Sequence, residues 1–167
     1  KKHLAYVIEN GKKSNENLII DSEFFLSKHK KHKYSIYVKT FLKIGIDWKE
    51  AQNSQTVISY ENFISSFPVN KKYCNEFKFY IENAKNEIEN LIWKNSRNIN
   101  TKLSYENYLM KYPNGKFQTK ASKFIEEFVW IELEKLNTIE SYEKYKKIYP
   151  NGPHYNLANL KIEEINW

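Results

Sequence analysis

The sequence predicts an all-α fold in which tandem helix-turn-helix units stack as a short α-solenoid. Three observations lead to this prediction: landmark residues recur at fixed spacings, aromatic residues step by three and then four positions, and a proline ends each aromatic run. The chain has only four glycines and four prolines in 167 residues. Such a composition suits long helices and disfavours a β-rich fold, and a chain of this length needs only one array.

Three copies of one unit share the same landmarks. In each copy a tryptophan stands eight residues before a threonine, a Ser-Tyr pair begins three residues after that threonine, and a proline follows the tyrosine by eight residues. The tryptophans are Trp48, Trp93 and Trp130, and the prolines are Pro68, Pro113 and Pro150. Copies two and three repeat with a period of 37 residues, whereas copy one has eight extra residues between its proline and the next tryptophan. The simplest place for these residues is inside the second helix, which they would lengthen by about 12 Å.

The first helix of each unit is predicted from its aromatic residues. They lie on one helical face: Tyr60, Phe63 and Phe67; Tyr105, Tyr108 and Tyr112; Tyr142, Tyr145 and Tyr149. A threonine or asparagine with a polar first turn marks the start, and the spacing from Asn137 to Glu140 fits a capping box. The proline ends the helix because it cannot continue one, and the Asn-Gly that follows it in copies two and three predicts a tight turn.

The second helix follows the turn. Its apolar residues are Phe117, Ala121, Phe124, Ile125 and Phe128 in copy two, and Ala158, Ile162 and Ile165 in copy three. Ala84, Ala121 and Ala158 occupy one matched position, where a small side chain lets two helices approach closely. A hairpin of two helices cannot cover its own apolar face, so we expect neighbouring units to stack, with most aromatic residues packed between helices.

A weaker copy precedes these three. Phe25-Leu26 and Lys33-Tyr34 match Tyr108-Leu109 and Lys116-Phe117 at a common offset of 83 residues, so we interpret residues 12–46 as a degenerate end repeat. The predicted organisation is one continuous array. It comprises residues 1–47 as a degenerate N-terminal repeat with a basic turn, residues 48–92 as a repeat with a long second helix, and residues 93–129 and 130–167 as two further repeats.

The stretch from Tyr105 to Phe117, Tyr-Glu-Asn-Tyr-Leu-Met-Lys-Tyr-Pro-Asn-Gly-Lys-Phe, with Ala121 after it, resembles tetratricopeptide-type repeats. The likeness is to the divergent bacterial kind, with an aromatic-Pro turn, and it covers about residues 48–167. The period of 37 differs from the standard 34, and aromatic residues replace the usual small residues of the first helix. The resemblance implies a right-handed stack of hairpins used for protein–protein contact, with ligands often lying along the first helices. It implies no chemistry.

The predicted function is therefore a non-catalytic scaffold for protein–protein interaction. The best candidates for partner contact are first-helix positions that the aromatic face leaves outward: Glu61, Asn62, Glu106, Asn107, Glu143 and Lys144. The alternative for these positions is plain solvent exposure. A different function, as a structural spacer or self-association module that holds a neighbouring domain, stays open. The chain opens at Lys1 without a methionine and closes at Trp167, which favours a piece of a longer protein that could carry other activities.

No catalytic, cofactor or metal site is predicted. Gly11 and Gly45 are isolated rather than part of a phosphate loop, and no motif links Cys74 to His154. The acidic residues of the second helices are expected on a solvated polar face; they are Glu126, Glu127, Glu163 and Glu164. The single cysteine excludes an intramolecular disulfide and favours a reducing, cytoplasmic location. No stretch of the sequence predicts a membrane span or a signal peptide.

Positive charge predicts an alternative function. The net charge is +7, and the surplus lies mainly in residues 1–50, around Lys28, Lys30, Lys31 and Lys33. This segment could bind nucleic acid or another anionic surface, or an acidic protein, or it could be an ordinary solvated turn between two helices. Arginine, the residue suited to bidentate phosphate recognition, occurs once. His29 and His32 have the spacing of one helical face and could supply two metal ligands, but no third ligand is near in sequence.

Overall fold

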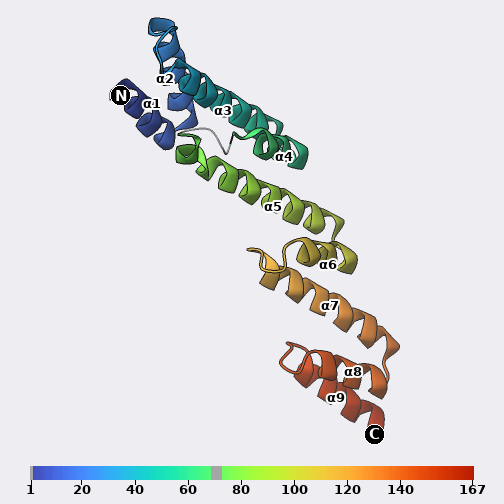
Figure 1. Ribbon diagram of the computed structural model, residues 1–167. Coiled ribbons are helices and arrows are strands. Elements are labelled where there is room, and N and C mark those ends of the chain that lie inside the picture. Colours follow the sequence, from blue (N-terminus) through green and yellow to red (C-terminus); the bar gives the residue numbers. More distant parts are fainter. Residues whose placement is uncertain (1, 69–72) are drawn as a thin grey trace. The chain divides into compact units, whose positions relative to one another are not determined.

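The computed structural model describes residues 2–68 and 73–167, which form α-helices and one short 3₁₀ helix with no strand among them (Figure 1). The predicted all-α class is confirmed. The contacts divide the chain into two compact units, residues 1–91 and residues 92–167. Within each unit the helices pack in chain order. No helix in the described ranges has both the length and the apolar character required to cross a bilayer.

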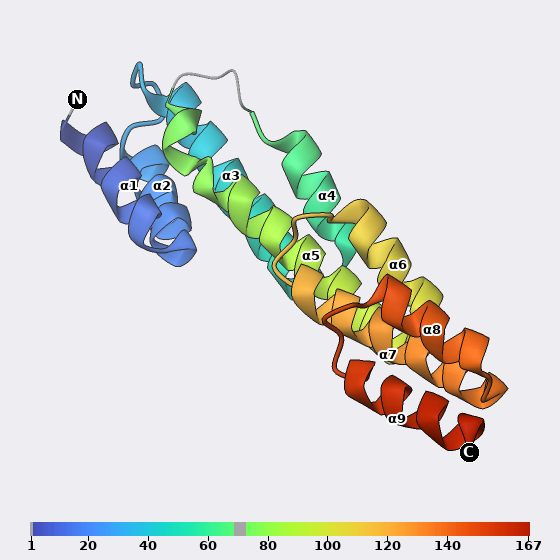
Figure 2. The same cartoon turned by 90° about the horizontal axis from the view of Figure 1, so that it is seen from below.

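Unit 1 is built from helices that pack on their neighbours in sequence. They are α1 (Lys2–Lys13), α2 (Asn15–Lys28), α3 (Ser35–Ser54), α4 (Val57–Ser66), the 3₁₀ helix η1 (Cys74–Phe77) and most of α5 (Phe79–Ile99). Figure 2 shows α1 and α2 side by side, and α2 packs in turn on α3. Helix α2 ends at Lys28 and α3 begins at Ser35, 83 residues before the end of α6 and the start of α7. The residues matched at an offset of 83 therefore lie in corresponding hairpins, α2–α3 and α6–α7, whose helices end and begin at matching positions.

Gly11 explains how α1 approaches its neighbours so closely. A Cβ atom at this position would lie 2.5 Å from Leu18 Cδ1 and 2.9 Å from Phe77 Cε1, closer than van der Waals contact allows. Both of these neighbours are fully buried. The Gly11 carbonyl also accepts a hydrogen bond of 3.3 Å from the Tyr80 hydroxyl. Glycine is required here for close packing of α1 against α2 and η1.

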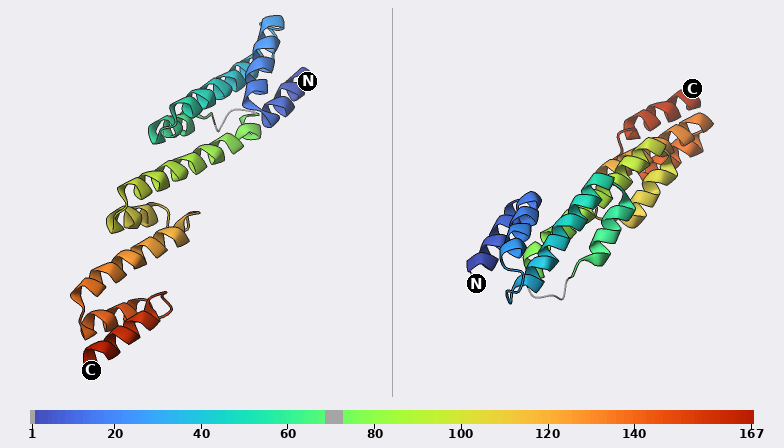
Figure 3. Two further views of the ribbon diagram at one scale, coloured as in Figure 1. Left: turned by 180° about the vertical axis from the view of Figure 1, so that it is seen from behind. Right: turned by 90° about the horizontal axis from the view of Figure 1, so that it is seen from above.

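Unit 2 contains the end of α5 and four further helices. These are α6 (Lys102–Lys111), α7 (Gln118–Leu136), α8 (Ile139–Ile148) and α9 (Tyr155–Asn166). Helix α6 packs on α7, α7 on α8, and α8 on α9. Figure 3 shows α8 and α9 as an antiparallel hairpin.

The first core of unit 2 surrounds Trp93, on α5. Its ring centroid lies 5.7 Å from that of Tyr105 and 5.2 Å from that of Tyr108, both on α6. Phe117 stacks parallel on it at 5.0 Å and 7°. Ala121 completes the cluster and is fully buried. The Tyr108 hydroxyl accepts a 3.1 Å hydrogen bond from the backbone N–H of Phe117, which fixes the entry into α7.

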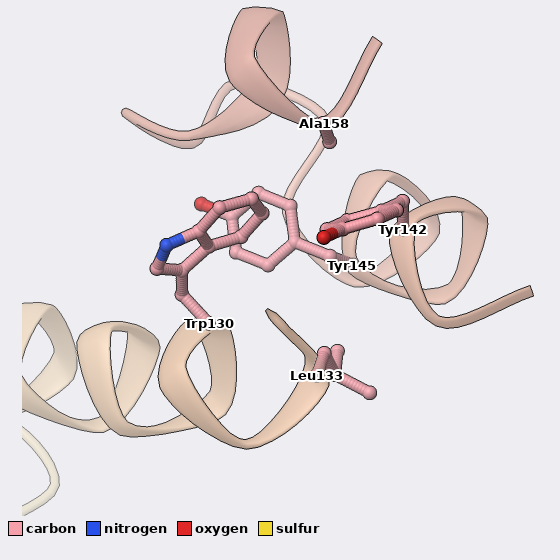
Figure 4. Packing of buried hydrophobic residues seen from close by; sticks show 5 residues of the cluster. All are labelled: Trp130, Leu133, Tyr142, Tyr145 and Ala158. Atoms are coloured by element: carbon pink, nitrogen blue, oxygen red, sulfur yellow. The ribbon is translucent and has the colours of Figure 1, made fainter. Parts of the chain in front are cut away.

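The second core surrounds Trp130, on α7, and repeats the first at an offset of 37 residues (Figure 4). The Trp130 ring lies 5.8 Å from Tyr142 and 5.0 Å from Tyr145, and His154 stacks on it at 4.7 Å and 7°. Ala158 takes the place of the earlier alanine. The Tyr145 hydroxyl again accepts from a backbone N–H, that of His154, at 3.3 Å. Side chains at matched positions thus have matched surroundings.

The start of each first helix is a capping box, but in copy three the residues differ from the prediction. The Thr138 side chain accepts from the Ser141 N–H at 3.1 Å, and the Ser141 hydroxyl accepts from the Thr138 N–H at 3.3 Å. The same reciprocal pair occurs at Thr56–Ser59 and Thr101–Ser104. The predicted pair Asn137–Glu140 is wrong. Asn137 instead ends α7 in a left-handed conformation, and its Oδ1 accepts from the Tyr142 hydroxyl at 2.8 Å.

The placement of the eight extra residues inside the second helix is also wrong. Helix α5 has 21 residues and its counterpart α7 has 19, so the helix gains only two. The other six lie between Pro68 and the start of α5, where Cys74–Phe77 forms η1 and residues 69–72 are outside the described ranges. Cys74 and Phe77 are fully buried, so the insertion mainly adds apolar residues to the core of unit 1 and lengthens the helix only slightly.

The tryptophans that mark the predicted repeat boundaries lie inside helices. Trp48 is on α3, Trp93 on α5 and Trp130 on α7, and each precedes the end of its helix by six residues. The tryptophan therefore belongs structurally to the second helix of one hairpin while its ring packs against the first helix of the next. This arrangement joins each hairpin to its successor.

Candidate protein-interaction surface

The candidate contact residues lie on the outward faces of α4, α6 and α8. Their positions follow from helix geometry: on α4, for example, Tyr60 and Phe63 are buried, so the two residues between them point outward. All six candidates are exposed: Glu61, Asn62, Glu106, Asn107, Glu143 and Lys144. Glu143 forms an exposed ion pair of 3.0 Å with Lys146 one turn later, which contributes little to stability. A role of these six residues in partner contact stays a prediction.

A groove between α3 and α4 in unit 1 was not predicted from the sequence. Its volume is about 320 Å³, and its floor is apolar, with Ile44 and Phe63 among the lining residues. Lys43 and Asp47 stand at its rim and form a salt bridge of 2.7 Å. A second hollow of about 320 Å³ shares these rim residues and extends to Asn62. The predicted contact residue Asn62 therefore borders a concave surface. This surface forms only where α3 and α4 meet, so neither helix sequence alone predicts it.

Two side-chain contacts connect α7 to the hairpin formed by α8 and α9. The Tyr145 hydroxyl donates to Glu126 Oε1 at 2.9 Å, and Glu127 Oε2 lies 2.8 Å from His154 Nε2. Glu126 is partly buried by this contact, which differs from the expected solvated stripe, whereas Glu127 is exposed as expected and contacts His154 from the surface. A Cβ atom on Gly152 would overlap the Tyr145 hydroxyl and the Glu126 carboxylate, so the glycine after the proline leaves room for this hydrogen bond.

The tyrosines of the two units act as neutral hydrogen-bonding groups. Burial, followed by the hydrogen bond to Glu126, raises the pKa of Tyr145 to about 12. Burial also raises the pKa of Tyr80 to about 12. Both phenols are therefore protonated at neutral pH, and each donates a hydrogen bond within the fold, Tyr80 to the Gly11 carbonyl and Tyr145 to Glu126.

The basic turn lies at the end of α2 and in the connection to α3. Lys28 is the last residue of α2, and Lys30, Lys31 and Lys33 follow before α3 begins. All four side chains are exposed, and no carboxylate in the described ranges forms a salt bridge with them. The turn is held by the Ser35 hydroxyl, which donates to the His29 carbonyl at 2.6 Å.

The histidines of this turn do not share a helical face, so that prediction is wrong. His29 ends α2 with φ −131°, and His32 lies in the turn beyond it. Their ring centroids are 6.0 Å apart, and both rings lie near Phe25, at 5.0 Å and 5.8 Å. No group of three or more metal-ligating side chains within residues 2–68 and 73–167 is placed to hold a metal ion. The histidines pack as aromatic rings.

Cys74 is 0% exposed in η1, so its thiol is shielded from any ligand in solvent.

Comparison of the chain with family models, with curated proteins and with solved structures finds no match in any of the three.

Proposed function

We propose that the chain is a non-catalytic helical-repeat scaffold of tetratricopeptide type, a short α-solenoid that binds another protein. The supporting observation is the repetition of one core in unit 2. Trp93 and Trp130 meet two tyrosines and one parallel ring each, at nearly equal distances and an offset of 37 residues. Hairpins that repeat their packing in this way also repeat their outward positions, which is how helical arrays form extended binding surfaces.

The proposed contact residues lie on the outward face of α4 in unit 1 and on the outward faces of α6 and α8 in unit 2. The first two present the same dipeptide, at Glu61-Asn62 and Glu106-Asn107, and the third presents Glu143-Lys144. Within unit 2, Glu106 and Glu143 occupy the same position of successive hairpins, which favours a partner with positive charge and hydrogen-bond donors spaced along an extended segment or a helix. The hollow beside Asn62 gives the face of α4 a concave part.

The test is capture of protein partners from the native host with the full chain and with two charge-reversal variants. The first variant combines Glu61→Lys, Glu106→Lys and Glu143→Lys. The matched control combines Glu16→Lys, Glu82→Lys and Glu134→Lys, which change the same net charge at exposed positions of other helices. We expect a partner that the control retains and the first variant loses. Recovery of no partner, or equal loss with both variants, would contradict the proposal.

A second candidate function is binding of an anionic surface through the basic turn, and the exposed lysines without carboxylate partners favour it. Binding of a labelled duplex oligonucleotide, and of vesicles that contain phosphatidylserine, should fall steeply with added salt. It should also be lost when Lys28, Lys30, Lys31 and Lys33 become alanine. Alanine at four other exposed lysines, Lys13, Lys49, Lys78 and Lys94, is the matched control. Binding that neither salt nor the first variant alters would exclude this function.

A further inference from the structure

The outward face of α2 carries an exposed apolar stripe that ends in a lysine. Ile20, Phe24 and Lys28 follow one another at spacings of four residues, so they lie on one side of the helix over about 12 Å. Ile20 is 53% and Phe24 is 65% exposed, and Lys28 is exposed as well. Helix α2 packs on α1 at one side and on α3 at the other, so this stripe is a lateral face of unit 1. A hollow of about 210 Å³ beside Phe24 is lined also by Tyr6 and His29.

Positive charge without carboxylate partners begins where this stripe ends. Residues 24–34 contain four lysines and no acidic residue. All four lysine side chains are exposed, and no carboxylate in the described part of the chain forms a salt bridge with them.

The acidic residues closest in sequence to Phe24 lie to either side of the stripe. Asp21 accepts a 2.9 Å hydrogen bond from Asn10 on α1, and Glu23 lines a hollow together with Leu42 of α3. The stripe and the lysines therefore form one amphipathic surface. This α2 surface consists of Ile20, Phe24, Lys28, Lys30, Lys31 and Lys33.

We infer that the α2 surface binds the face of an anionic lipid bilayer. The lysines contact the lipid phosphates, and Ile20 and Phe24 enter the boundary between the head groups and the acyl chains. Each basic side chain near an anionic leaflet is attracted to it, and apolar side chains that enter the boundary strengthen the binding. The long lysine stems let the charges stay at the head groups while the apolar side chains go deeper.

The apolar stripe favours a bilayer over nucleic acid. A duplex offers phosphates to the lysines but no apolar region to Ile20 and Phe24, so these two side chains would not add to its affinity. Arginine, which suits bidentate phosphate contacts, occurs only as Arg97 on α5. The inference rests on the second proposed function, binding through the basic turn, and names its partner. It does not depend on partner contact at α4, α6 or α8.

Vesicle co-sedimentation with the full chain tests the inference. The chain should bind vesicles of phosphatidylcholine mixed with phosphatidylserine, and not vesicles of phosphatidylcholine alone. Ile20→Ser combined with Phe24→Ser should weaken this binding by about tenfold or more, without any effect on binding of a duplex oligonucleotide. The matched control combines Ile58→Ser and Leu103→Ser, which are 69% and 63% exposed on α4 and α6, and it should leave vesicle binding unchanged. Alanine at the four lysines should weaken binding of both ligands.

A dye at position 24 reports on insertion directly. Cys74 is fully buried, so a thiol-reactive dye on a Phe24→Cys variant labels that one position. The emission of an environment-sensitive dye there should move to shorter wavelength when vesicles with phosphatidylserine are added. The same dye on a Leu103→Cys variant should not respond.

Two results would overturn the inference directly: a serine variant of the stripe that binds vesicles as tightly as the natural chain, or a dye at position 24 that responds no more than the dye at position 103. Binding of the oligonucleotide without binding of vesicles would also overturn it and would leave the second proposed function intact. If neither ligand binds, the inference and that function both fail.

Discussion

Removal of the Tyr145 hydroxyl is the most informative single perturbation of unit 2. This oxygen donates to the Glu126 carboxylate at 2.9 Å and accepts from the His154 N–H at 3.3 Å, while its ring packs on Trp130. Tyr145→Phe preserves the ring and deletes both hydrogen bonds. The change therefore separates the contribution of the hydroxyl from that of aromatic packing.

The expected loss is about 2 kcal/mol in the free energy of unfolding. A hydrogen bond to a charged group contributes about 1.5–3 kcal/mol, and a buried N–H left without its acceptor costs about 1 kcal/mol more. Glu126 is only partly buried and regains water in the variant, which offsets part of this loss. Tyr142→Phe is the internal control, because its hydroxyl donates to the neutral and exposed Asn137. That variant should lose no more than about 1 kcal/mol.

Urea denaturation followed by circular dichroism measures both variants. A double-mutant cycle between Tyr145→Phe and Glu126→Gln should give a coupling energy of about 1 kcal/mol or more. If Tyr145→Phe costs no more than Tyr142→Phe, or if the coupling energy is near zero, the hydroxyl does not connect α7 to α8 in the way described here.

Three further outcomes are expected. Thr138→Ala should destabilise the protein by about 1 kcal/mol in urea titrations because it removes the helix cap. Glu140→Ala should change stability by less than about 0.5 kcal/mol. A larger loss for Glu140→Ala than for Thr138→Ala would instead support the capping box between Asn137 and Glu140. Gly11→Ala should cost about 1–3 kcal/mol through overpacking, and a melting temperature equal to that of the natural chain would show that α1 does not pack as described. Because the pKa values of Tyr80 and Tyr145 are raised to about 12 from about 10 in the unfolded chain, their contribution to stability is present below pH 10 and is lost as the pH rises from 10 through 12. Urea midpoints recorded at pH 9, 10.5 and 11.5 should fall in that order, and a constant midpoint would contradict the burial of these phenols.

The internal repetition predicts much of the fold because it reports on packing directly. Residues at matched offsets, such as Trp93 and Trp130 or Ala121 and Ala158, have matched neighbours, and an aromatic step of three and four residues identifies the first helices correctly. These features depend on local periodicity, which one sequence contains in full.

Features that depend on contacts between distant residues could not be obtained in this way. The length of the insertion after Pro68 fits two helical turns, but the insertion supplies Cys74 and Phe77 to the core of unit 1. Gly11 is an isolated glycine in the sequence, and its requirement comes from Leu18 on α2 and Phe77 on η1. The groove between α3 and α4 likewise depends on residues of both helices, and neither helix shows a distinctive sequence pattern there.

The sequence predicts the hydrogen-bond partners of polar residues least well. Asn137 and Glu140 have the spacing of a capping box. In the structure Asn137 adopts a left-handed conformation and ends α7, so the N-cap of α8 is Thr138, one residue after the predicted N-cap. Glu126 appears in the sequence as one acid of a polar stripe. Its bond to Tyr145 depends on the room that Gly152 leaves, across the turn between α8 and α9.

The central claim is that one packing arrangement occurs twice in unit 2, and coupling energies test it most directly. Double-mutant cycles should be measured for Trp93 with Tyr108 and for Trp130 with Tyr145, with leucine at each position; the ring centroids are 5.2 Å and 5.0 Å apart. We predict favourable couplings of about 0.5–1.5 kcal/mol in both cycles, equal within about 0.5 kcal/mol. A coupling in one pair and none in the other would show that the two hairpins do not share their packing.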